Sequence, residues 1–315
     1  MTAQDNSSIG FHLPEPIVVL DLTMSDGAIV RVRRHGNING PRLILSHGNG
    51  FAIDAYFPFW RRFLHDYEVV VFDQRNHGWN PRHHASGHSQ LQMAEDMETI
   101  LRRVAAEFGE RATAGVFHSL STLVSLLHSK RYGFQWNALV LFDPPLAPPA
   151  GHPLHSTARN FELALSDWAR QRRRSFHRVD ELALYFRGTR RMRRWVPGAA
   201  ELMARSITRP FSDGTVELVC PPEFEANIYL QNSDSPTWSV LPDVARDVFV
   251  VSCDYDMQDA DPPGLVSKTL RADFGIAVVP VRDTGHLLQI ERPEEVEAIV
   301  REHLRSRGLN GAQVR

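Results

Sequence analysis

Short apolar runs alternate with helical patterns along most of the chain. The runs have the length and continuity of strands buried on both faces of a sheet; they are "RLILSHG", "YEVVVFD", "TAGVFHS", "ALVLFDPP", "DVFVVSCD" and "IAVVPVRD". Between two of them, Met93, Met97, Leu101 and Val104 recur at helical spacing. Strands that alternate with helices of this length predict an α/β protein with a mostly parallel sheet covered on both faces.

The two ends of this pattern have signals of their own. Two apolar runs flank the turn sequence Ser25-Asp26-Gly27, which predicts an antiparallel hairpin before the parallel strands. Helices are expected at 54–67, 89–110, 121–133 and 291–308. The last of these has Pro293 and acidic residues in its first turn, as helix N-termini prefer.

The alternation stops from about Ala147 to Pro242, where no convincing buried-strand run occurs. Phe161, Leu165 and Trp168 are spaced as on one face of a helix. We therefore predict a core made of residues 1–146 and 243–315, with a helical cap at 147–242 inserted between two strands.

Composition narrows the class of protein. The chain has 315 residues, 43% of them hydrophobic, and a formal net charge of −2, so nothing in the overall charge indicates a nucleic-acid partner. No apolar run approaches the roughly 20 residues of a membrane span, and the polar N-terminus does not resemble a secretory leader. Cys220 and Cys253 are expected to be free thiols. These features predict a cytoplasmic protein, and homodimerisation is compatible with them.

Residues whose side chains could take part in catalysis follow the predicted strands. Ligands of open parallel sheets collect at the carboxyl ends of the strands, and there the sequence places Ser119, Asp143, Asp256 and His286. A serine, an acid and a histidine are the side chains of nucleophilic acyl transfer. Their order along the chain is Ser, Asp, His.

This order and its surroundings resemble the α/β-hydrolase superfamily, in the capped branch that contains esterases, lactonases and meta-cleavage-product hydrolases. The motifs that carry the resemblance are "LSHGNG", "DQRNHG", "FHSLS", "CDYD" and "DTGHLLQIERPEE". The resemblance implies the α/β-hydrolase fold. It also implies that Ser119 is the nucleophile, that His286 is the general base, and that the backbone N–H groups of Asn49 and Leu120 form the oxyanion hole.

The predicted serine corner departs from the common pattern Gly-x-Ser-x-Gly. Phe117 stands two residues before Ser119, and Ser121 stands two residues after it. Small residues are needed at both positions because they press against each other. We therefore expect either that the corner opens or that the Phe117 ring points away from the contact. Ser121 as nucleophile would place Leu123 at the second flanking position, which fits less well.

The acid of the triad has three candidates. If Cys253 takes the glycine position of the motif Gly-x-x-Asp, then Asp256 is the acid, and this is our first choice. Asp143 follows the preceding strand and is the alternative, because some related hydrolases place their acid there. Asp254 is the third candidate, on the opposite side of an extended segment.

Two further groups of residues have a structural interpretation. We expect Asp73 and Arg75 to brace loops through a charge-assisted contact, and His47 to hold its loop rather than to react. The spacing of His77, His83, His84 and His88 matches no common metal site. No metal and no organic cofactor is therefore expected.

The segment 151–210 has an uneven charge, with 13 arginines and 5 acidic residues, a net +8. Solvated helix faces would explain this, and so would a cap that attracts an anionic small-molecule substrate. The predicted function is serine hydrolysis of a carboxylic ester or lactone through an acyl-enzyme. The alternatives are carbon–carbon bond hydrolysis of a dienoic keto acid by the same triad, or a non-catalytic ligand receptor.

Overall fold

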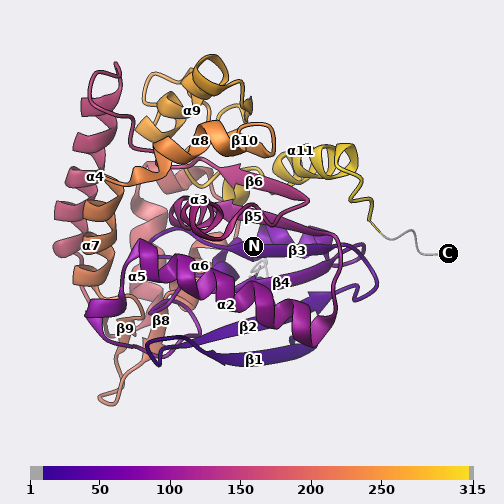
Figure 1. Cartoon of the computed structure of the whole chain (residues 1–315). Helices are drawn as coiled ribbons and strands as arrows, with labels where there is room; N and C mark the ends of the chain where they lie inside the picture. The colour runs from indigo at the N-terminus through magenta and orange to yellow at the C-terminus, as the bar shows by residue number, and fades with distance from the viewer. Residues whose placement is uncertain (1–9, 312–315) are drawn as a thin grey trace, which may run out of the picture.

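The computed structural model describes residues 10–311, in which a mostly parallel sheet forms the middle layer (Figure 1). Its eight strands lie in the order β1-β2-β4-β3-β5-β6-β10-β11, and only the pairs β1–β2 and β2–β4 are antiparallel. The strands are β1 (Val18–Thr23), β2 (Ile29–Gly36), β3 (Arg42–Ser46), β4 (Glu68–Phe72), β5 (Thr113–His118), β6 (Ala138–Phe142), β10 (Val248–Ser252) and β11 (Ala277–Pro280). Each predicted strand is therefore present, and the hairpin is β1–β2.

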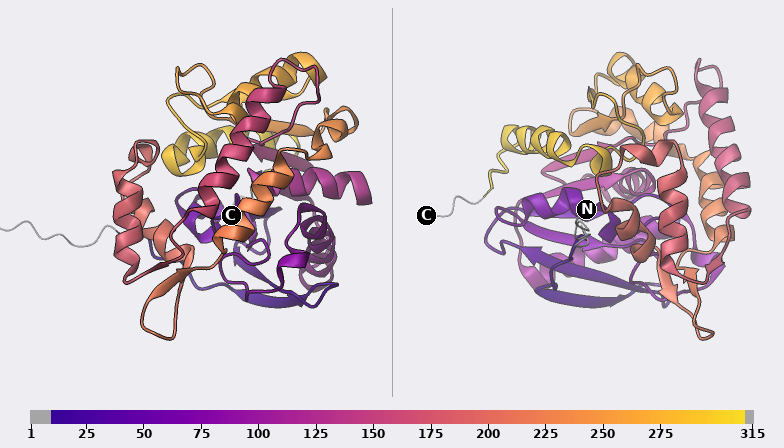
Figure 2. Two further views of the ribbon diagram at one scale, coloured as in Figure 1. Left: turned by 90° about the vertical axis from the view of Figure 1, so that its left-hand side faces the viewer. Right: turned by 180° about the vertical axis from the view of Figure 1, so that it is seen from behind.

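Helices cover both faces of this sheet, as Figure 2 shows from two further sides. The helices of the described residues are α1 (Phe57–Trp60), α2 (Gln90–Phe108), α3 (Leu120–Tyr132), α4 (His155–Arg170), α5 (Val179–Gly188), α6 (Ala199–Ser206), α7 (Pro222–Asn232), α8 (Leu241–Val244), α9 (Pro262–Phe274), α10 (Leu288–Glu291) and α11 (Pro293–Ser306). Helix α2 begins where the Ser89 hydroxyl accepts a hydrogen bond from the Gln92 N–H.

The side chains of the strands divide between two hydrophobic cores, because successive residues of a strand point to opposite faces. On β4, Val69 and Val71 belong to one core, while Val70 and Phe72 belong to the other. The first core includes α11, and the second includes α2 and α3. Burial on both faces is the physical reason that the apolar runs in the sequence are continuous rather than alternating.

Two segments differ from the sequence-based expectation. Residues 54–67 were expected to form one helix, but they form α1 between two short 3₁₀ turns, Ile53–Tyr56 and Arg61–Phe63. Aromatic side chains here are buried in several directions, so packing overrides the helical periodicity. The segment 147–242 contains α4 to α7 as expected, and also a small sheet of β7 (Ser175–Phe176), β9 (Val216–Leu218) and β8 (Thr208–Pro210), which the sequence did not predict.

The central sheet in the described part of the chain receives no strand from 147–242. Helices α4 and α7 pack against each other beside the sheet (Figures 1 and 2). Within residues 10–311 no helix has the length and apolarity needed to cross a membrane. The expectation that the N-terminus carries no secretory leader concerns mainly residues 1–9, which lie outside the described part.

Candidate active site

Ser119 occupies a sharp corner between β5 and α3. It has φ 52° and ψ −117°, a conformation that costs energy for any residue other than glycine. The Ser119 N–H donates to the Phe142 carbonyl oxygen of the neighbouring strand at 3.1 Å, which ties the corner to the sheet. Strain held by surrounding structure is characteristic of functional positions, and here it presents the hydroxyl at the carboxyl edge of the sheet.

The Phe117 ring is accommodated because it lies over Gly115. A Cβ atom built on Gly115 would stand 2.6 Å from Phe117 Cε2. The ring also makes an edge contact with Trp136, with ring centroids 5.3 Å apart. Of the two expected solutions, the structure adopts the second, in which the ring points away from the corner. Gly115 therefore supplies the space that a flanking glycine provides in the common motif.

Gly115→Ala should accordingly destabilise the protein. The new methyl group would meet Phe117, Leu139 and Trp136 side chains at 2.6, 2.9 and 3.0 Å. Overpacking of this kind costs about 1–3 kcal/mol of unfolding free energy. Chemical denaturation monitored by tryptophan fluorescence would measure it. Gly188→Ala is the matched control, because a Cβ there has no neighbour within 4 Å; equal stabilities of the two variants would contradict this account of the corner.

Ser121 is engaged on the inner side of the same corner. Its Oγ accepts from the His118 N–H and donates to the His118 carbonyl oxygen, both at 2.9 Å. The residue is fully buried. Ser121 thus has the geometry of a brace for the corner, whereas Ser119 faces the cavity at the carboxyl edge of the sheet.

Ser119, His286 and Asp143 form one hydrogen-bonded line. His286 Nε2 lies 3.0 Å from Ser119 Oγ, and His286 Nδ1 lies 2.6 Å from Asp143 Oδ2. Because the carboxylate accepts, Nδ1 carries the proton and Nε2 is free to accept one from the serine hydroxyl. The structure brings together the serine and histidine that the sequence selected, with the alternative acid.

Asp256, the first choice for the acid, is not part of this line, and that prediction is corrected here. Its carboxylate is exposed and pairs with Lys268 Nζ and Arg282 Nη1, both at 2.8 Å. Hydrogen bonds from Lys268 and then Arg282 hold the pKa of Asp256 below its usual value. The cause is the turn after β10: Asp254 accepts from the Asp256 N–H at 3.1 Å, and the Asp256 side chain then projects toward solvent.

Asp143 is positioned by the end of the adjacent strand. It follows β6 with a left-handed φ of 44° and is fully buried. Its Oδ1 accepts from the Cys253 N–H at 3.2 Å and lies 3.3 Å from Ser252 Oγ. The two oxygens thus have separate tasks: Oδ1 is anchored to β10, and Oδ2 is directed at His286. Asp254, the third candidate, instead accepts the Asp283 N–H.

The environment of His286 favours its protonated form. Burial alone would lower the pKa of the imidazole, but the hydrogen bond and charge of Asp143, together with the charges of Asp261 and Glu162, raise it above the ordinary value. A base whose protonated form is stabilised by nearby acids accepts a proton from a hydroxyl more readily.

The loop after β3 brings Asn49 to the same place. A Cβ atom built on Gly48 would lie 3.0 Å from Ser119 Cβ, so the loop backbone packs directly on the serine corner. The flanking N–H groups are engaged, Gly48 with Tyr56 Oη and Gly50 with His77 Nε2. For the Asn49 N–H, no acceptor exists among residues 10–311.

Leu120, the second expected oxyanion donor, is the first residue of α3. The N–H groups of a first helical turn have no partner within the helix, and the helix dipole favours negative charge there. Asn49 and Leu120 therefore flank Ser119 with unused donors, which is the arrangement that an oxyanion hole requires.

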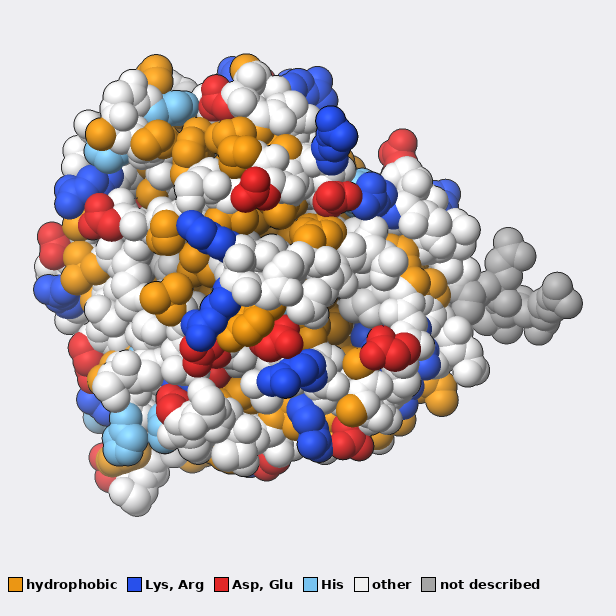
Figure 3. Space-filling model, viewed as in Figure 1, with side chains coloured by type: hydrophobic (Ala, Val, Ile, Leu, Met, Phe, Trp, Pro, Cys, Tyr) orange, Lys and Arg blue, Asp and Glu red, His pale blue; other side chains and the backbone are white. Residues whose placement is uncertain are grey.

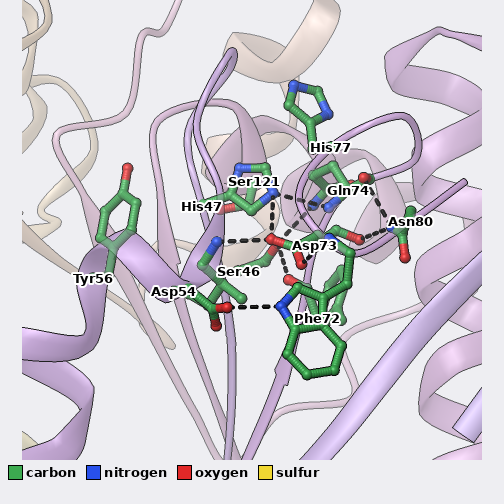
Figure 4. Close-up of polar contacts among 12 residues, drawn as sticks. Ser46, His47, Asp54, Tyr56, Phe72, Asp73, Gln74, His77, Asn80 and Ser121 are labelled. Atoms are coloured by element: carbon green, nitrogen blue, oxygen red, sulfur yellow. Dashed lines mark hydrogen bonds and ion pairs between the residues drawn. The ribbon is translucent and has the colours of Figure 1, made fainter. Parts of the chain in front are cut away.

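Two neutral histidines hold the loop of Asn49. His47 Nε2 accepts from the Gln74 N–H at 3.0 Å, and its Nδ1 donates to the Gly48 carbonyl oxygen at 2.8 Å. Burial lowers the pKa of His47 and of His77, so both act without charge. Figure 4 shows His47 and Gln74 lying beside Asp73. The expected holding role of His47 matches this geometry.

Asp73 and Arg75 brace loops with partners that the sequence did not indicate. Asp73 accepts from the Ile53 and Trp79 N–H groups at 2.8 and 3.1 Å. Arg75 instead forms ion pairs with Asp26 and Asp96 at 2.6 and 2.7 Å. The single contact expected between Asp73 and Arg75 is therefore replaced by two separate sets of contacts, one for each residue.

His118 and Tyr56 connect three segments of the site, and sequence reasoning missed this connection. His118 Nε2 lies 2.8 Å from the His286 carbonyl oxygen, so it carries the proton, and Tyr56 Oη therefore donates to Nδ1 at 2.7 Å. Tyr56 Oη in turn accepts from the Gly48 N–H. One chain of hydrogen bonds thereby fixes the loop of Asn49, the serine corner and the loop of His286 relative to one another. The pair His118-Ser119 was the only signal in the sequence.

A cavity of about 150 Å³ opens onto these residues. Ser119, His286 and Asn49 line it on one side, while Phe161 and Trp168 of α4 line it on another. Most of its lining surface is apolar, as is usual for a small-molecule site, and charged side chains contribute to the lining as well. The segment 147–242 thus borders the space in front of the serine.

The positive charge of 151–210 is not directed into this cavity. Arg194 is the one arginine of that segment, among those whose side chains are described, that lines the cavity. Most of the others pair with acids, several from outside the segment: Arg172 with Glu225, Arg190 with Asp259 at 3.2 Å, and Arg209 with Glu217 at 2.9 Å. Figure 3 likewise shows basic and acidic side chains interspersed on its face. This geometry argues against attraction of an anionic substrate by the cap.

Metal ligation has no evident place in the described residues, where no three His, Cys, Asp or Glu side chains come together in a way that could hold an ion. His77 and His88 stack on each other, with ring centroids 5.7 Å apart, rather than converging on a common point.

Residues 43–299 match the alpha/beta hydrolase family. The chain belongs to this family. The match spans most of the chain and includes the serine corner, Asp143 and His286. No curated protein sequence matches the chain.

Solved structures of α/β hydrolases have the same fold. E-2-(acetamidomethylene)succinate hydrolase is 20% identical, with 91% of this chain and 99% of that chain covered and a TM-score of 0.74. A carboxylesterase structure from Nitrososphaera gargenis is 14% identical, covering 92% and 99%, with a TM-score of 0.67. Bromoperoxidase from Bacillus anthracis is 13% identical, covering 91% and 99%, with a TM-score of 0.68. At these identities the similarity concerns the fold alone.

Proposed function

We propose that this α/β hydrolase is a serine hydrolase that cleaves a carboxylic ester or lactone through an acyl-enzyme intermediate. The observation that carries the proposal is the line from Ser119 Oγ through His286 to Asp143, with distances of 3.0 and 2.6 Å. The line ends in a cavity that can hold a small molecule. Residues 147–242 act as its cap.

In the first half-reaction Ser119 Oγ attacks the substrate carbonyl carbon, while His286 Nε2 takes the hydroxyl proton. The N–H groups of Asn49 and Leu120 stabilise the negative oxygen of the tetrahedral intermediate. Collapse of the intermediate breaks the bond to the alcohol oxygen, which leaves with the proton from His286. Asp143 keeps the imidazole oriented and stabilises the imidazolium.

In the second half-reaction water attacks the acyl-enzyme carbonyl, and His286 takes its proton. The new tetrahedral intermediate expels Ser119 Oγ, which regains the proton from His286, and the carboxylic acid departs. Each half-reaction returns His286 to its neutral form, so no further acid or cofactor is consumed.

The two alternatives receive less support from the structure. A hydrolase of dienoic keto acids needs basic groups for the substrate carboxylate, and the cavity offers Arg194 beside several acids. A receptor has no need of a serine within hydrogen-bond distance of a buried histidine–aspartate pair.

Labelling with a fluorophosphonate tests the proposal. The reagent should phosphonylate Ser119 and abolish ester hydrolysis, because that hydroxyl borders the cavity and is paired with His286. Mass spectrometry of peptides would locate the adduct. An adduct at Ser121, or unlabelled protein that still hydrolyses esters, would refute the assignment.

The pH dependence of kcat/KM for a neutral ester should rise with the deprotonation of His286. Since Asp143, Asp261 and Glu162 raise the pKa of His286, the midpoint should lie above 6.5, the ordinary value. Glu162→Gln removes one of these negative charges and should move the midpoint to lower pH. Asp180→Asn, an exposed charge change on α5, should leave it in place. Identical profiles for wild type and Glu162→Gln would contradict the charge interaction.

A further inference from the structure

The charged residues that line the cavity are mostly acidic. They are Glu162, Asp259, Asp261 and Glu291, against Arg194 and the base His286, and Asp259 is paired with Arg190. Burial raises the pKa of Glu291 to about 7, although the hydrogen bond from the Gly285 N–H and the charge of Arg194 oppose the shift. The cavity lining thus contains more acids than bases, unlike the arginine-rich segment beside it. An anionic substrate would meet repulsion there, and a cationic one attraction.

Glu162 is held in place as a hydrogen-bond acceptor. Asn232 Nδ2 donates to Glu162 Oε2 at 2.8 Å, and Asn232 Oδ1 accepts from Gln90 Nε2 at 2.6 Å. Gln90 Oε1 accepts in turn from Ser235 Oγ at 3.0 Å. This buried chain joins α4, α7 and the start of α2. It orients the Glu162 carboxylate at the cavity wall, 5% exposed.

Among the described residues no arginine or lysine forms an ion pair with Glu162, and His286 is the basic group whose charge acts on it. Burial raises the pKa of its carboxyl to about 7, although the Asn232 hydrogen bond opposes the shift. A buried carboxylate without a counter-ion is costly, and a bound cation removes that cost. A cationic group of the substrate can therefore act as the counter-ion of Glu162.

Asn49, on the loop after β3, gives an independent indication. Its Nδ2 donates to the Glu225 carbonyl oxygen at 2.9 Å, which fixes the orientation of the amide. Its Oδ1 is buried and has no hydrogen-bond partner among the described residues. Asn49 lines the same cavity as Ser119 and is 2% exposed. An unsatisfied buried acceptor calls for a ligand that donates hydrogen bonds.

We propose that the substrate carries a protonated amine in its acyl part, close to the scissile carbonyl, which is recognised by Glu162 and Asn49. A primary ammonium combines positive charge with three N–H donors, as the two acceptors require. Phe161, Trp168 and Tyr229 line the cavity as well, and aromatic rings attract cations. This inference rests on the proposed ester hydrolysis, and it names the class of ester.

The test compares phenyl esters of 3-aminopropanoic, butanoic and succinic acid. The first two differ only by ammonium in place of methyl, and the third carries a carboxylate. Glu162→Gln should reduce the ratio of kcat/KM for the aminoacyl ester to that for the butanoyl ester by about 10-fold or more. Comparing this ratio between the wild type and the variant removes the effect of the different intrinsic reactivities of the esters. The glutamine Oε1 still accepts from Asn232, so the hydrogen-bond chain is retained.

Asp180→Asn is the matched control, because it removes the same charge from an exposed position on α5. It should leave the ratio unchanged. A ratio that is the same in wild type and Glu162→Gln, or succinyl ester as the preferred substrate of the wild type, would overturn the inference.

A binding measurement separates this inference from the proposed function. Titration of 3-aminopropanamide and butanamide, followed by NMR of the protein, needs no turnover. Tighter binding of the amine, lost in Glu162→Gln, supports the inference even if no ester is cleaved, in which case the proposed function alone fails. Equal binding of the two amides by the wild type overturns the inference.

Discussion

Asp143→Asn should lower kcat for ester hydrolysis by about 10⁴-fold, while Asp256→Asn should change it less than about 2-fold. The reason lies in the two oxygens of Asp143. The Cys253 N–H must be met by an oxygen, so the asparagine would keep Oδ1 there and turn its NH₂ group toward His286 Nδ1. The imidazole proton would then move to Nε2, where it faces Ser119 and prevents that nitrogen from accepting the hydroxyl proton.

Steady-state kinetics of the two variants, with melting temperatures as a check on folding, would measure this difference. Asp256 is exposed on a turn and pairs with Lys268 and Arg282, so its substitution removes surface ion pairs that contribute little to stability. A large loss of activity in Asp256→Asn, together with wild-type activity in Asp143→Asn, would show that Asp256, the acid predicted first from the sequence, is the acid of the triad.

The fold could be predicted from the sequence because the signals for its strands and helices are local. Strands buried on both faces, such as "EVVVF" of β4, are continuous apolar runs, and the helices between them have periodic apolar faces. The corner at Ser119 was found because a serine followed a buried strand and preceded a helix. The space for Phe117 was not accessible, since it depends on how Gly115 and Trp136 meet across neighbouring elements.

The acid could not be chosen from the sequence because two strands end beside the same histidine. β6 and β10 are neighbours in the sheet, and each is followed by an aspartate. The choice depends on a turn: Asp254 accepts backbone N–H groups of Asp256 and Asp283, and this directs the Asp256 side chain outward. Such a turn is set by contacts with the loop after β11, which lies far along the chain.

The charge of the cavity was hidden for a similar reason. The arginines of 151–210 are concentrated in one part of the sequence. Several of their ion-pair partners, Glu217, Glu225 and Asp259, come from later segments. Glu162 is a single acid within that basic block, and only the packing of α4 against α7 shows that it borders the site. Charge summed over a segment therefore predicts the charge of a cavity poorly.

Ser119→Ala should lower kcat by about 10⁴-fold or more while leaving substrate binding and stability nearly unchanged. Alanine has the same strained backbone to adopt at φ 52°, and the N–H bond to Phe142 is retained, so the corner should persist. Ser121→Ala is the contrasting variant: it removes the brace on His118 but no reacting atom, so its loss of activity should be far smaller. Turnover assays, with binding of a non-hydrolysable amide followed by NMR, would measure both. If Ser119→Ala retained activity close to that of the wild type, the hydroxyl that lies 3.0 Å from His286 would not be the nucleophile, and an acyl-enzyme at this serine would be excluded.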